Sequence, residues 1–397
     1  MKIIIAGKND IAVDVLDYVI KNNLASEIFV VVNKTEKFRN SFQKSLGFYS
    51  KLWNIKIVDL EDVYNIDDVI FLSLEFDQIV KTNLFKTKKL YNIHFSLLPS
   101  YRGMYTSTIP ILNNEEKTGV TLHEIDDGID TGNIIDQKSF KIHDNDTARD
   151  LYIKYIKYGT ELVISNLSNI FSGDFTSHPQ LELNVSYYSK SYIDFSNIKI
   201  KLNVLAHQLV NQLRAYSFRE YQLPKLESFQ ISSWSITKDK SLISGKVVFD
   251  KDKRSAIVST KDFDVILYFD LYESLWNLCK INNYKFLKKL LANNSLLIDK
   301  KNSNGWTALI IAVYNGSYEC VEILLHYGAD CNACNYNFTN VLMYAKENAI
   351  KTKDMKILNL LFEYKINMFS EDIYGKNIFD WVKEEDVNLY KFFKNKI

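Results

Sequence analysis

The chain has 397 residues, a length that corresponds to two or three domains with substantial cores. Its 49 basic and 48 acidic side chains leave a formal charge of +1, so net charge alone does not attract it to nucleic acid or to an anionic membrane. Hydrophobic residues make up 47% of the chain, which excludes the mostly disordered classes. Because no apolar run approaches the roughly 18 residues of a membrane span, and no signal peptide opens the chain, we expect a cytoplasmic protein.

Residues 1–183 alternate short apolar runs with amphipathic stretches, which predicts an α/β domain with a Rossmann-like, mainly parallel sheet. The runs expected to form strands are 2–7, 28–32, 56–58, 69–74, 91–94, 119–125 and 133–140. Asp10 is expected to cap one helix, and a long helix is expected from about Thr147. The turn 7–10 has neither a dinucleotide fingerprint nor a P-loop, although a helix N-terminus there can receive a phosphate.

Residues 184–268 have a different pattern. One helix is expected to present Leu202, Leu205, Leu209 and Leu213, and the alternating runs 229–236, 244–249 and 256–260 predict a small antiparallel sheet. We expect this region to extend the surface of the first domain.

Residues 270–397 contain an internal repeat, with one clear unit over 304–330 that reads as turn, helix, turn and helix. Shifts of about 33 residues superpose its leucines on earlier and later ones, so the region resembles an all-α array of about three ankyrin repeats, with a worn fourth or capping turn near 375–381. Trp306 is the residue of this array that could contact a partner or ligand. The alternative is that its ring packs on a neighbouring repeat. Cys331 and Cys334 have C-x-x-C spacing but no second pair, so we expect neither a metal site nor a redox site there.

The residues that carry chemistry lie between 92 and 132. In the segment 92–103 (NIHFSLLPSYRG), Asn92 and His94 are two apart on an extended chain and point the same way. The later segment 119–132 (GVTLHEIDDGIDTG) is a strand followed by an acidic turn that can bring Asp130 to the imidazole. An amide donor, a base and an orienting carboxylate suit acyl transfer to an amine.

These two segments resemble the 10-formyltetrahydrofolate-dependent formyltransferases. The resemblance implies that Asn92, His94 and Asp130 are the catalytic set, that the chain is a homodimer, and that no metal is required. It also places the pterin between a backbone loop and the acidic turn; the residues implied are Phe76, Gln78, Ile79, Val80, Asp126 and Asp127. Asp126 and Asp127 are equally compatible with a purely structural turn.

Within this family, the chain looks like a bacterial sugar N-formyltransferase that acts on a nucleotide-linked amino sugar. The likeness implies dTDP-3-amino-3,6-dideoxyglucose as the acceptor and a role in O-antigen and lipopolysaccharide synthesis. The residues proposed to bind this substrate are Lys8, Asn9, Asp10, Arg102, Tyr105, Thr106, Ser107 and Tyr221. Arg102 is expected to hold the diphosphate with its guanidinium fork.

Two other classes of function remain open from the sequence. A metal-dependent hydrolase could use His94, His123, Asp127 and Asp130, since mixed His and Asp sets bind zinc or iron. His123, between two strand residues, is otherwise expected to be structural. The second alternative is an ankyrin interaction protein with a vestigial enzyme domain.

Overall fold

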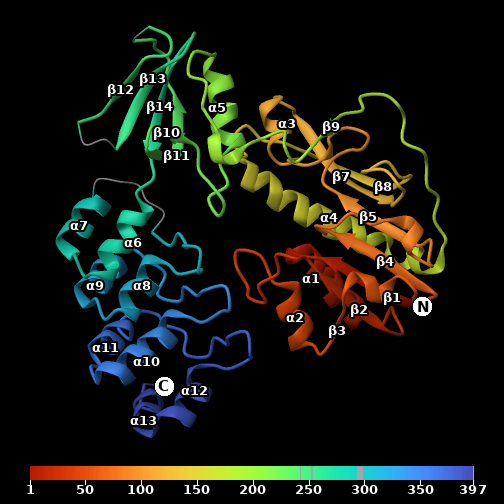
Figure 1. Cartoon of the computed structure of the whole chain (residues 1–397). Coiled ribbons are helices and arrows are strands. Elements are labelled where there is room, and N and C mark those ends of the chain that lie inside the picture. The colour runs from red at the N-terminus through yellow and green to blue at the C-terminus, as the bar shows by residue number, and fades with distance from the viewer. Residues whose placement is uncertain (242, 252–253, 293–297, 397) are drawn as a thin grey trace. The chain divides into compact units, whose positions relative to one another are not determined.

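Figure 1 shows the computed structural model of the chain, which describes residues 1–241, 243–251, 254–292 and 298–396. The chain forms two compact units. One comprises Met1–Arg39 and Gln43–Asp270, and the other comprises Asn40–Phe42 and Leu271–Ile397. Among the described residues, no helix has both the length and the apolar character needed to cross a bilayer.

A seven-stranded sheet organises the first unit, with its strands in the order β3-β2-β1-β4-β5-β7-β8. The strands are β1 (Lys2–Gly7), β2 (Ile28–Val32), β3 (Lys56–Ile57), β4 (Val69–Leu74), β5 (Leu90–His94), β7 (Lys117–Glu124) and β8 (Ile134–Lys141). Strands β1 to β5 pair in parallel, whereas β7 pairs antiparallel with both β5 and β8. The predicted mainly parallel α/β fold is therefore confirmed.

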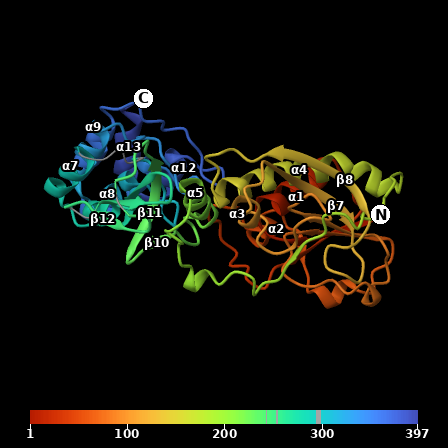
Figure 2. The ribbon, with the colours of Figure 1, turned by 90° about the horizontal axis from the view of Figure 1, so that it is seen from above.

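Two amphipathic helices cover one face of this sheet because their apolar stripes match its apolar strands. The buried side chains of α1 (Asn9–Lys21) and α4 (Ala148–Ser172) share one core with Ile3, Leu72 and Ile93. Both helices can be followed in Figures 1 and 2. The other face packs under shorter segments that include η1 (Leu60–Val63). The remaining elements of this part of the chain are α2 (Leu46–Leu52), η2 (Thr82–Leu84), β6 (Arg102–Gly103), α3 (Ile109–Leu112) and β9 (Tyr187–Tyr188).

The start of α1 differs from the prediction. Lys8 is the N-cap residue, so Asp10 lies in the first turn of the helix and does not cap it. The Asp10 carboxylate instead accepts a hydrogen bond of 2.6 Å from the backbone N–H of Lys44, which anchors the loop before α2. Thr147, by contrast, caps α4 as expected, since its side chain accepts from the Asp150 N–H.

A five-stranded antiparallel sheet completes the first unit, in the order β10-β11-β14-β13-β12. Its elements are η3 (Phe195–Asn197), α5 (Ala206–Ala215), β10 (Lys225–Leu226), β11 (Phe229–Ile236), β12 (Val247–Phe249), β13 (Ser255–Ser259) and β14 (Asp264–Phe269). The small antiparallel sheet is confirmed, but the sequence did not predict β14. The run 265–269 is uniformly apolar and lacks the alternation that marked its neighbours.

Successive helix pairs form the second unit and enclose one continuous hydrophobic core. The helices are α6 (Tyr272–Lys280), α7 (Tyr284–Ala292), α8 (Ala308–Tyr314), α9 (Tyr318–His326), α10 (Val341–Thr352), α11 (Lys356–Leu361), α12 (Ile378–Glu385) and α13 (Val387–Lys394). Leu275, Leu309 and Leu342 are buried in three successive first helices, which confirms the predicted register. The fourth unit is more complete than the worn turn that was expected, because α12 and α13 form a helix pair of their own.

Trp306 lies on the turn before α8, where its ring packs against two tyrosines. Its centroid is 5.0 Å from that of Tyr314 and 5.0 Å from that of Tyr344. The ring is half-buried. This packing fits the structural alternative, and a contact between Trp306 and a partner stays a prediction.

We expect Tyr155 of α4 to contribute strongly to the free energy of unfolding of the first unit. Its fully buried ring stacks on Phe95 at 5.3 Å, and its hydroxyl donates to the Thr106 carbonyl at 3.0 Å. Tyr155→Ala should therefore lower the free energy of unfolding by about 3–5 kcal/mol, and Tyr155→Phe by about 1 kcal/mol. Hydrogen exchange of the α4 amides in increasing urea measures both.

The half-exposed Tyr268, on the small sheet, offers a matched control. Tyr268→Phe should change the stability by less than about 0.5 kcal/mol. Equal effects of Tyr155→Phe and Tyr268→Phe would contradict the role assigned to the Tyr155 hydroxyl.

Candidate active site

The sheet brings the two predicted motifs together where β5 ends. Asn92 and His94 are the third and fifth residues of β5, and the antiparallel neighbour β7 places His123 directly opposite Asn92. The turn after β7 then returns the chain so that Asp130 reaches the same place. The predicted set Asn92, His94 and Asp130 is thus gathered at the carboxyl end of a strand, where parallel sheets form their sites.

The Asp130 carboxylate is the centre of this arrangement. One of its oxygens lies 3.5 Å from His94 Nδ1 and accepts a 2.9 Å hydrogen bond from the Gly103 N–H, and the other lies 3.7 Å from His123 Nε2. Burial alone raises the pKa of this carboxyl, but the charge of His94, the neighbouring His123 ring and the hydrogen bond from the Gly103 N–H together hold the pKa of Asp130 well below its usual range. Asp130 therefore stays ionised at neutral pH.

The His94 ring is fixed by contacts on both of its nitrogens. Its Nε2 lies 2.8 Å from the Tyr101 carbonyl oxygen, and since a carbonyl can only accept, Nε2 is the donor. The nitrogen that can take up a proton is then Nδ1, the one that faces Asp130. The lone pair that Nδ1 carries in this tautomer suits the role of a general base.

His123 holds the Asn92 amide in place. Asn92 Nδ2 donates to His123 Nε2 at 3.0 Å, and His123 Nδ1 donates to the Glu124 carbonyl at 2.7 Å. One N–H of Asn92 is thereby committed to His123, and no described residue accepts from the second. These contacts fit the structural role expected for His123.

The loop that follows His94 is tied down by residues distant in sequence. Arg102 donates from Nε and Nη2 to Gln180 Oε1, at 3.2 and 2.6 Å, and Gln180 donates in turn to the carbonyl of Asp130 at 2.8 Å. The Tyr105 hydroxyl donates to the carbonyls of Lys190 and Ile193. Thr106 and Ser107 continue this loop to α3. The structure therefore assigns Arg102 a positioning contact, and its contact to a diphosphate stays a prediction.

Just after the predicted pterin loop, the Thr82 hydroxyl at the start of η2 donates to the Asp127 carboxylate of the acidic turn. Phe76 packs edge-on against Phe71 at 6.2 Å, whereas Ile79 is 74% exposed. Gln78 and Val80, the other members of this loop, are half-buried.

Asp126 stabilises the acidic turn from within. Its carboxylate accepts from the Gly128 N–H at 3.1 Å and from the Thr131 hydroxyl at 2.6 Å. These contacts fit the structural alternative for Asp126, and its contact to a cofactor stays a prediction.

The turn Lys8–Asp10 also lies at this edge of the sheet, since the Lys8 N–H donates to the carbonyl of Leu74, the last residue of β4. Asn9 points to Glu75, while Asp10 is engaged by Lys44. Tyr221 is 64% exposed, with its ring 4.7 Å from that of Phe218.

Sequence reasoning missed three side chains at this edge of the sheet, namely Glu75, Tyr152 and Gln180. Glu75 and Tyr152 share a hydrogen bond of 2.8 Å. Glu75 follows a strand directly, which is a usable signal for a site. Gln180 lies in a segment without periodicity, and nothing in its sequence context marks it.

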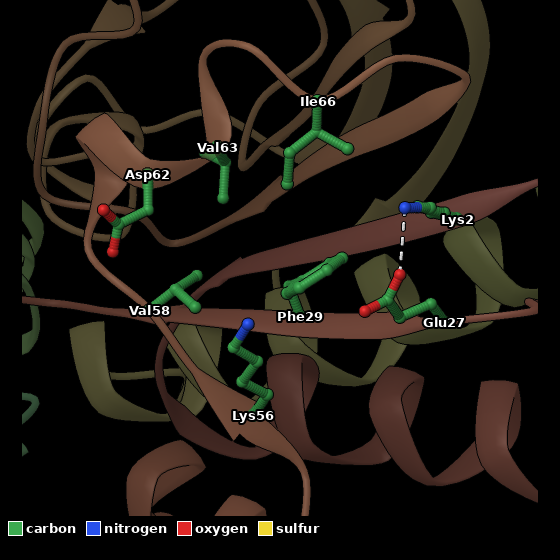
Figure 3. Close-up of a pocket in the computed structure, with 8 residues that line it drawn as sticks. All are labelled: Lys2, Glu27, Phe29, Lys56, Val58, Asp62, Val63 and Ile66. Atoms are coloured by element: carbon green, nitrogen blue, oxygen red, sulfur yellow. Dashed lines mark ion pairs between the residues drawn. The ribbon is translucent and has the colours of Figure 1, made fainter.

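A hollow of about 470 Å³ lies elsewhere on the first unit (Figure 3). It is lined by Lys2, Phe29 and Lys56, which stand at the start of β1, β2 and β3, and by the loop after β3. Lys2 Nζ forms an ion pair of 3.0 Å with Glu27 there. The hollow is at the amino edge of the sheet, so it does not belong to the site around His94.

The metal-dependent alternative finds no support in the geometry. Within the described ranges, no three His, Cys, Asp or Glu side chains are grouped as ligands of one metal ion. His94 Nε2 and His123 Nε2 are directed to Tyr101 and Asn92. Cys331 donates to the Lys365 carbonyl at 3.6 Å.

Two family profiles match the chain. The profile described as formyl transferase matches residues 62–167, which include Asn92, His94 and Asp130. The profile described as ankyrin repeats, three copies, matches residues 275–372. Both predicted resemblances are confirmed by these matches.

Individual relatives support the same assignment. The methionyl-tRNA formyltransferase of Clostridioides difficile (strain 630) is 30% identical over 282 residues, which cover 66% of this chain and 89% of that protein.

Two solved structures are similar to about two thirds of this chain. An N-formyltransferase from Helicobacter canadensis, solved with folinic acid and dTDP-3-aminofucose, is 43% identical with a TM-score of 0.63, and the match covers 68% of this chain and 100% of that one. WlaRD, a sugar 3N-formyl transferase solved with dTDP and 5-N-formyl-THF, is 45% identical with a TM-score of 0.63, over 68% and 97% of the two chains. With its Asn92, His94 and Asp130 set at the carboxyl edge of the sheet, this chain belongs to the formyl transferase family.

Proposed function

We propose that the protein transfers a formyl group from 10-formyltetrahydrofolate to the amine of a nucleotide-linked amino-deoxy sugar. The observation that carries this proposal is the buried Asp130 carboxylate, which holds His94 next to the Asn92 amide. The two similar structures were solved with a folate and a thymidine nucleotide or nucleotide sugar, which supports the same pair of substrates here.

The residues present fit a folate. The loop after β4 offers the exposed Ile79 to an aromatic ring system, and the acidic turn tied to it by Thr82 offers carbonyl and carboxylate acceptors to pterin N–H groups. This loop lies next to β5 in the sheet, so it borders the site of His94. The folate supplies the formyl carbon when it is bound.

The protein's own residues then assist the attack of the sugar amine on that carbon. His94 Nδ1 takes the proton that the amine loses, while Asp130 stabilises the resulting imidazolium. The second N–H of Asn92 donates to the oxygen on which negative charge develops. His94 returns the proton to the departing nitrogen, so that the protons balance.

The finer predictions rest on the resemblance alone. They are dTDP-3-amino-3,6-dideoxyglucose as the acceptor, a role in O-antigen and lipopolysaccharide synthesis, and a homodimer. The same holds for Arg102, Tyr105, Thr106, Ser107 and Tyr221 as substrate contacts. A panel of amino-sugar nucleotides, read out by the absorbance of released tetrahydrofolate, tests the choice of sugar directly.

Replacement of His94 should identify the general base. We expect His94→Asn to lower kcat by at least ~10²-fold, because general-base catalysis contributes about that much. The KM values of both substrates should change little, because the imidazole that the substitution removes acts on the reacting amine. Steady-state kinetics measure both, with the exposed His143 as a control in the variant His143→Asn. A near-normal kcat in His94→Asn would remove His94 from this role.

Replacement of Asp130 should change stability in a pH-dependent way. The pKa of the native carboxyl lies below its unfolded value of about 3.9. The ionised group therefore stabilises the fold above that pH, and this contribution disappears as the pH falls through the lower native pKa.

We expect Asp130→Asn to cost about 2 kcal/mol at neutral pH. The gap to the wild type should persist to about pH 4 and narrow only below it. Urea denaturation across this pH range measures the gap, and the exposed Asp144 provides a control as Asp144→Asn. A gap that is absent at pH 7 would argue against the stabilised carboxylate.

Removal of the second unit should leave catalysis measurable. The Helicobacter canadensis structure is matched over its whole length by 68% of this chain, and Asn92, His94 and Asp130 all lie in the first unit. A chain of residues 1–270 should therefore fold and release tetrahydrofolate. A folded truncation without turnover would show that residues 271–397 complete the active site.

A further inference from the structure

A second polar cluster lies beside His94, at the end of the neighbouring strand. Glu75 is the first residue after β4, and it has a left-handed backbone with a φ of 57°. The parallel register pairs Ser73 with Asn92 and Leu74 with Ile93, so the next step along both strands brings Glu75 beside His94. Glu75 and the catalytic set therefore share one edge of the sheet.

Two distant segments bring their side chains to Glu75. Gly7 ends β1 with a φ of 152°, at a position where a Cβ atom would lie 1.8 Å from the Leu74 carbonyl oxygen, so only glycine permits this close approach. Asn9 Nδ2 then donates to the Glu75 carboxylate at 3.0 Å. The Tyr152 hydroxyl, from α4, donates to both carboxylate oxygens at 3.0 and 2.8 Å. We call Asn9, Glu75 and Tyr152 the Glu75 cluster.

The cluster is held at a cost in backbone energy. Asn9 is left-handed as well, with a φ of 66°. Left-handed residues other than glycine cost of order 1–3 kcal/mol each and gather at functional sites. Glu75, one strand away from the catalytic histidine, is such a residue, whereas an asparagine such as Asn9 adopts this conformation readily.

The Glu75 carboxylate keeps acceptor capacity for a ligand. Burial raises the pKa of Glu75, against the lowering effects of the Lys8 charge and of the hydrogen bonds from Asn9 and Tyr152. The two oxygens of a carboxyl group offer up to about four acceptor directions. Among the described side chains only Asn9 and Tyr152 donate to it. A carboxylate repels phosphate but accepts hydrogen bonds from hydroxyl groups.

We propose that the Glu75 cluster binds the hydroxyl groups of the hexose that carries the reacting amine, and so determines which sugar is accepted. This inference rests on the proposed function. Neighbouring strands lie about 4.8 Å apart, a distance that one pyranose ring bridges. A hexose whose amine reaches His94 thus presents an adjacent hydroxyl to Glu75. Asn9 then belongs to the sugar subsite and not to the phosphate subsite expected from the sequence.

The variant Glu75→Gln keeps the shape of the side chain and removes its charge. We expect kcat/KM for dTDP-3-amino-3,6-dideoxyglucose to fall at least ~10-fold, the effect of losing a hydrogen bond to a charged group. The KM for the folate and the Kd of dTDP, which lacks the hexose, should stay within about twofold. Glu116→Gln is the matched control, because Glu116 is exposed.

A second comparison removes the sugar's side of the contact. The analogue without the hydroxyl next to the amine should lose about as much with the wild type as Glu75→Gln loses with the full sugar. Glu75→Gln should not discriminate between the two sugars, as expected for two partners of one hydrogen bond. Removal of the hydroxyl could instead lower kcat/KM by the same factor in the wild type and in Glu75→Gln, or Glu75→Gln could weaken the binding of dTDP. Either result would overturn the inference.

Binding separates this inference from the proposed function. Calorimetry with dTDP and dTDP-glucose measures the affinity that the hexose adds, without any turnover. That gain should be present in the wild type and absent in Glu75→Gln, even if no amino sugar is formylated. If Glu75→Gln does not fold, Tyr152→Phe tests the same cluster, and an undiminished hexose gain in Tyr152→Phe would contradict it.

Discussion

One buried carboxylate organises the site on which the rest of the structure converges. Asp130 lies between two imidazoles and a backbone N–H, contributed by β5, β7 and β6. Each contact compensates part of the free-energy cost of burying a charge. The loss of any one contact leaves part of that cost uncompensated. The carboxylate therefore fixes three separate segments relative to one another, and catalysis benefits from that constraint.

The sheet topology explains why this convergence is possible. β7 runs antiparallel to β5, so His123 stands opposite Asn92, and the turn after β7 comes back to the end of β5. On the other side, the parallel neighbour β4 carries Glu75 to the same edge. The position of Asn92, His94 and Asp130 thus follows from the pairing of β5 with β7. The position of the proposed sugar subsite follows from the pairing of β5 with β4.

The short-range parts of this site could be predicted from sequence. Asn92 and His94 share a face because strands alternate, and the acidic turn is marked by its own composition. The contacts that could not be predicted join residues far apart in the chain, such as Gln180 with Arg102 and Tyr152 with Glu75. Asp10 shows the same limit, because a contact to Lys44 displaced the local preference for a cap. The register of the ankyrin repeats could be predicted because the spacing of the repeated leucines is visible in the sequence alone.

The left-handed residues around the site have a consequence for engineering. Asn9, Glu75, Tyr101, Tyr105 and Asp130 all have positive φ values, whereas Asn23 and Asn54 have them at turns remote from the site. Glycine relaxes such a backbone. A search for thermostable variants would thus find favourable glycines at Asn23 and Asn54, whereas a glycine at Asp130 or Glu75 would remove a side chain whose contacts hold the site together.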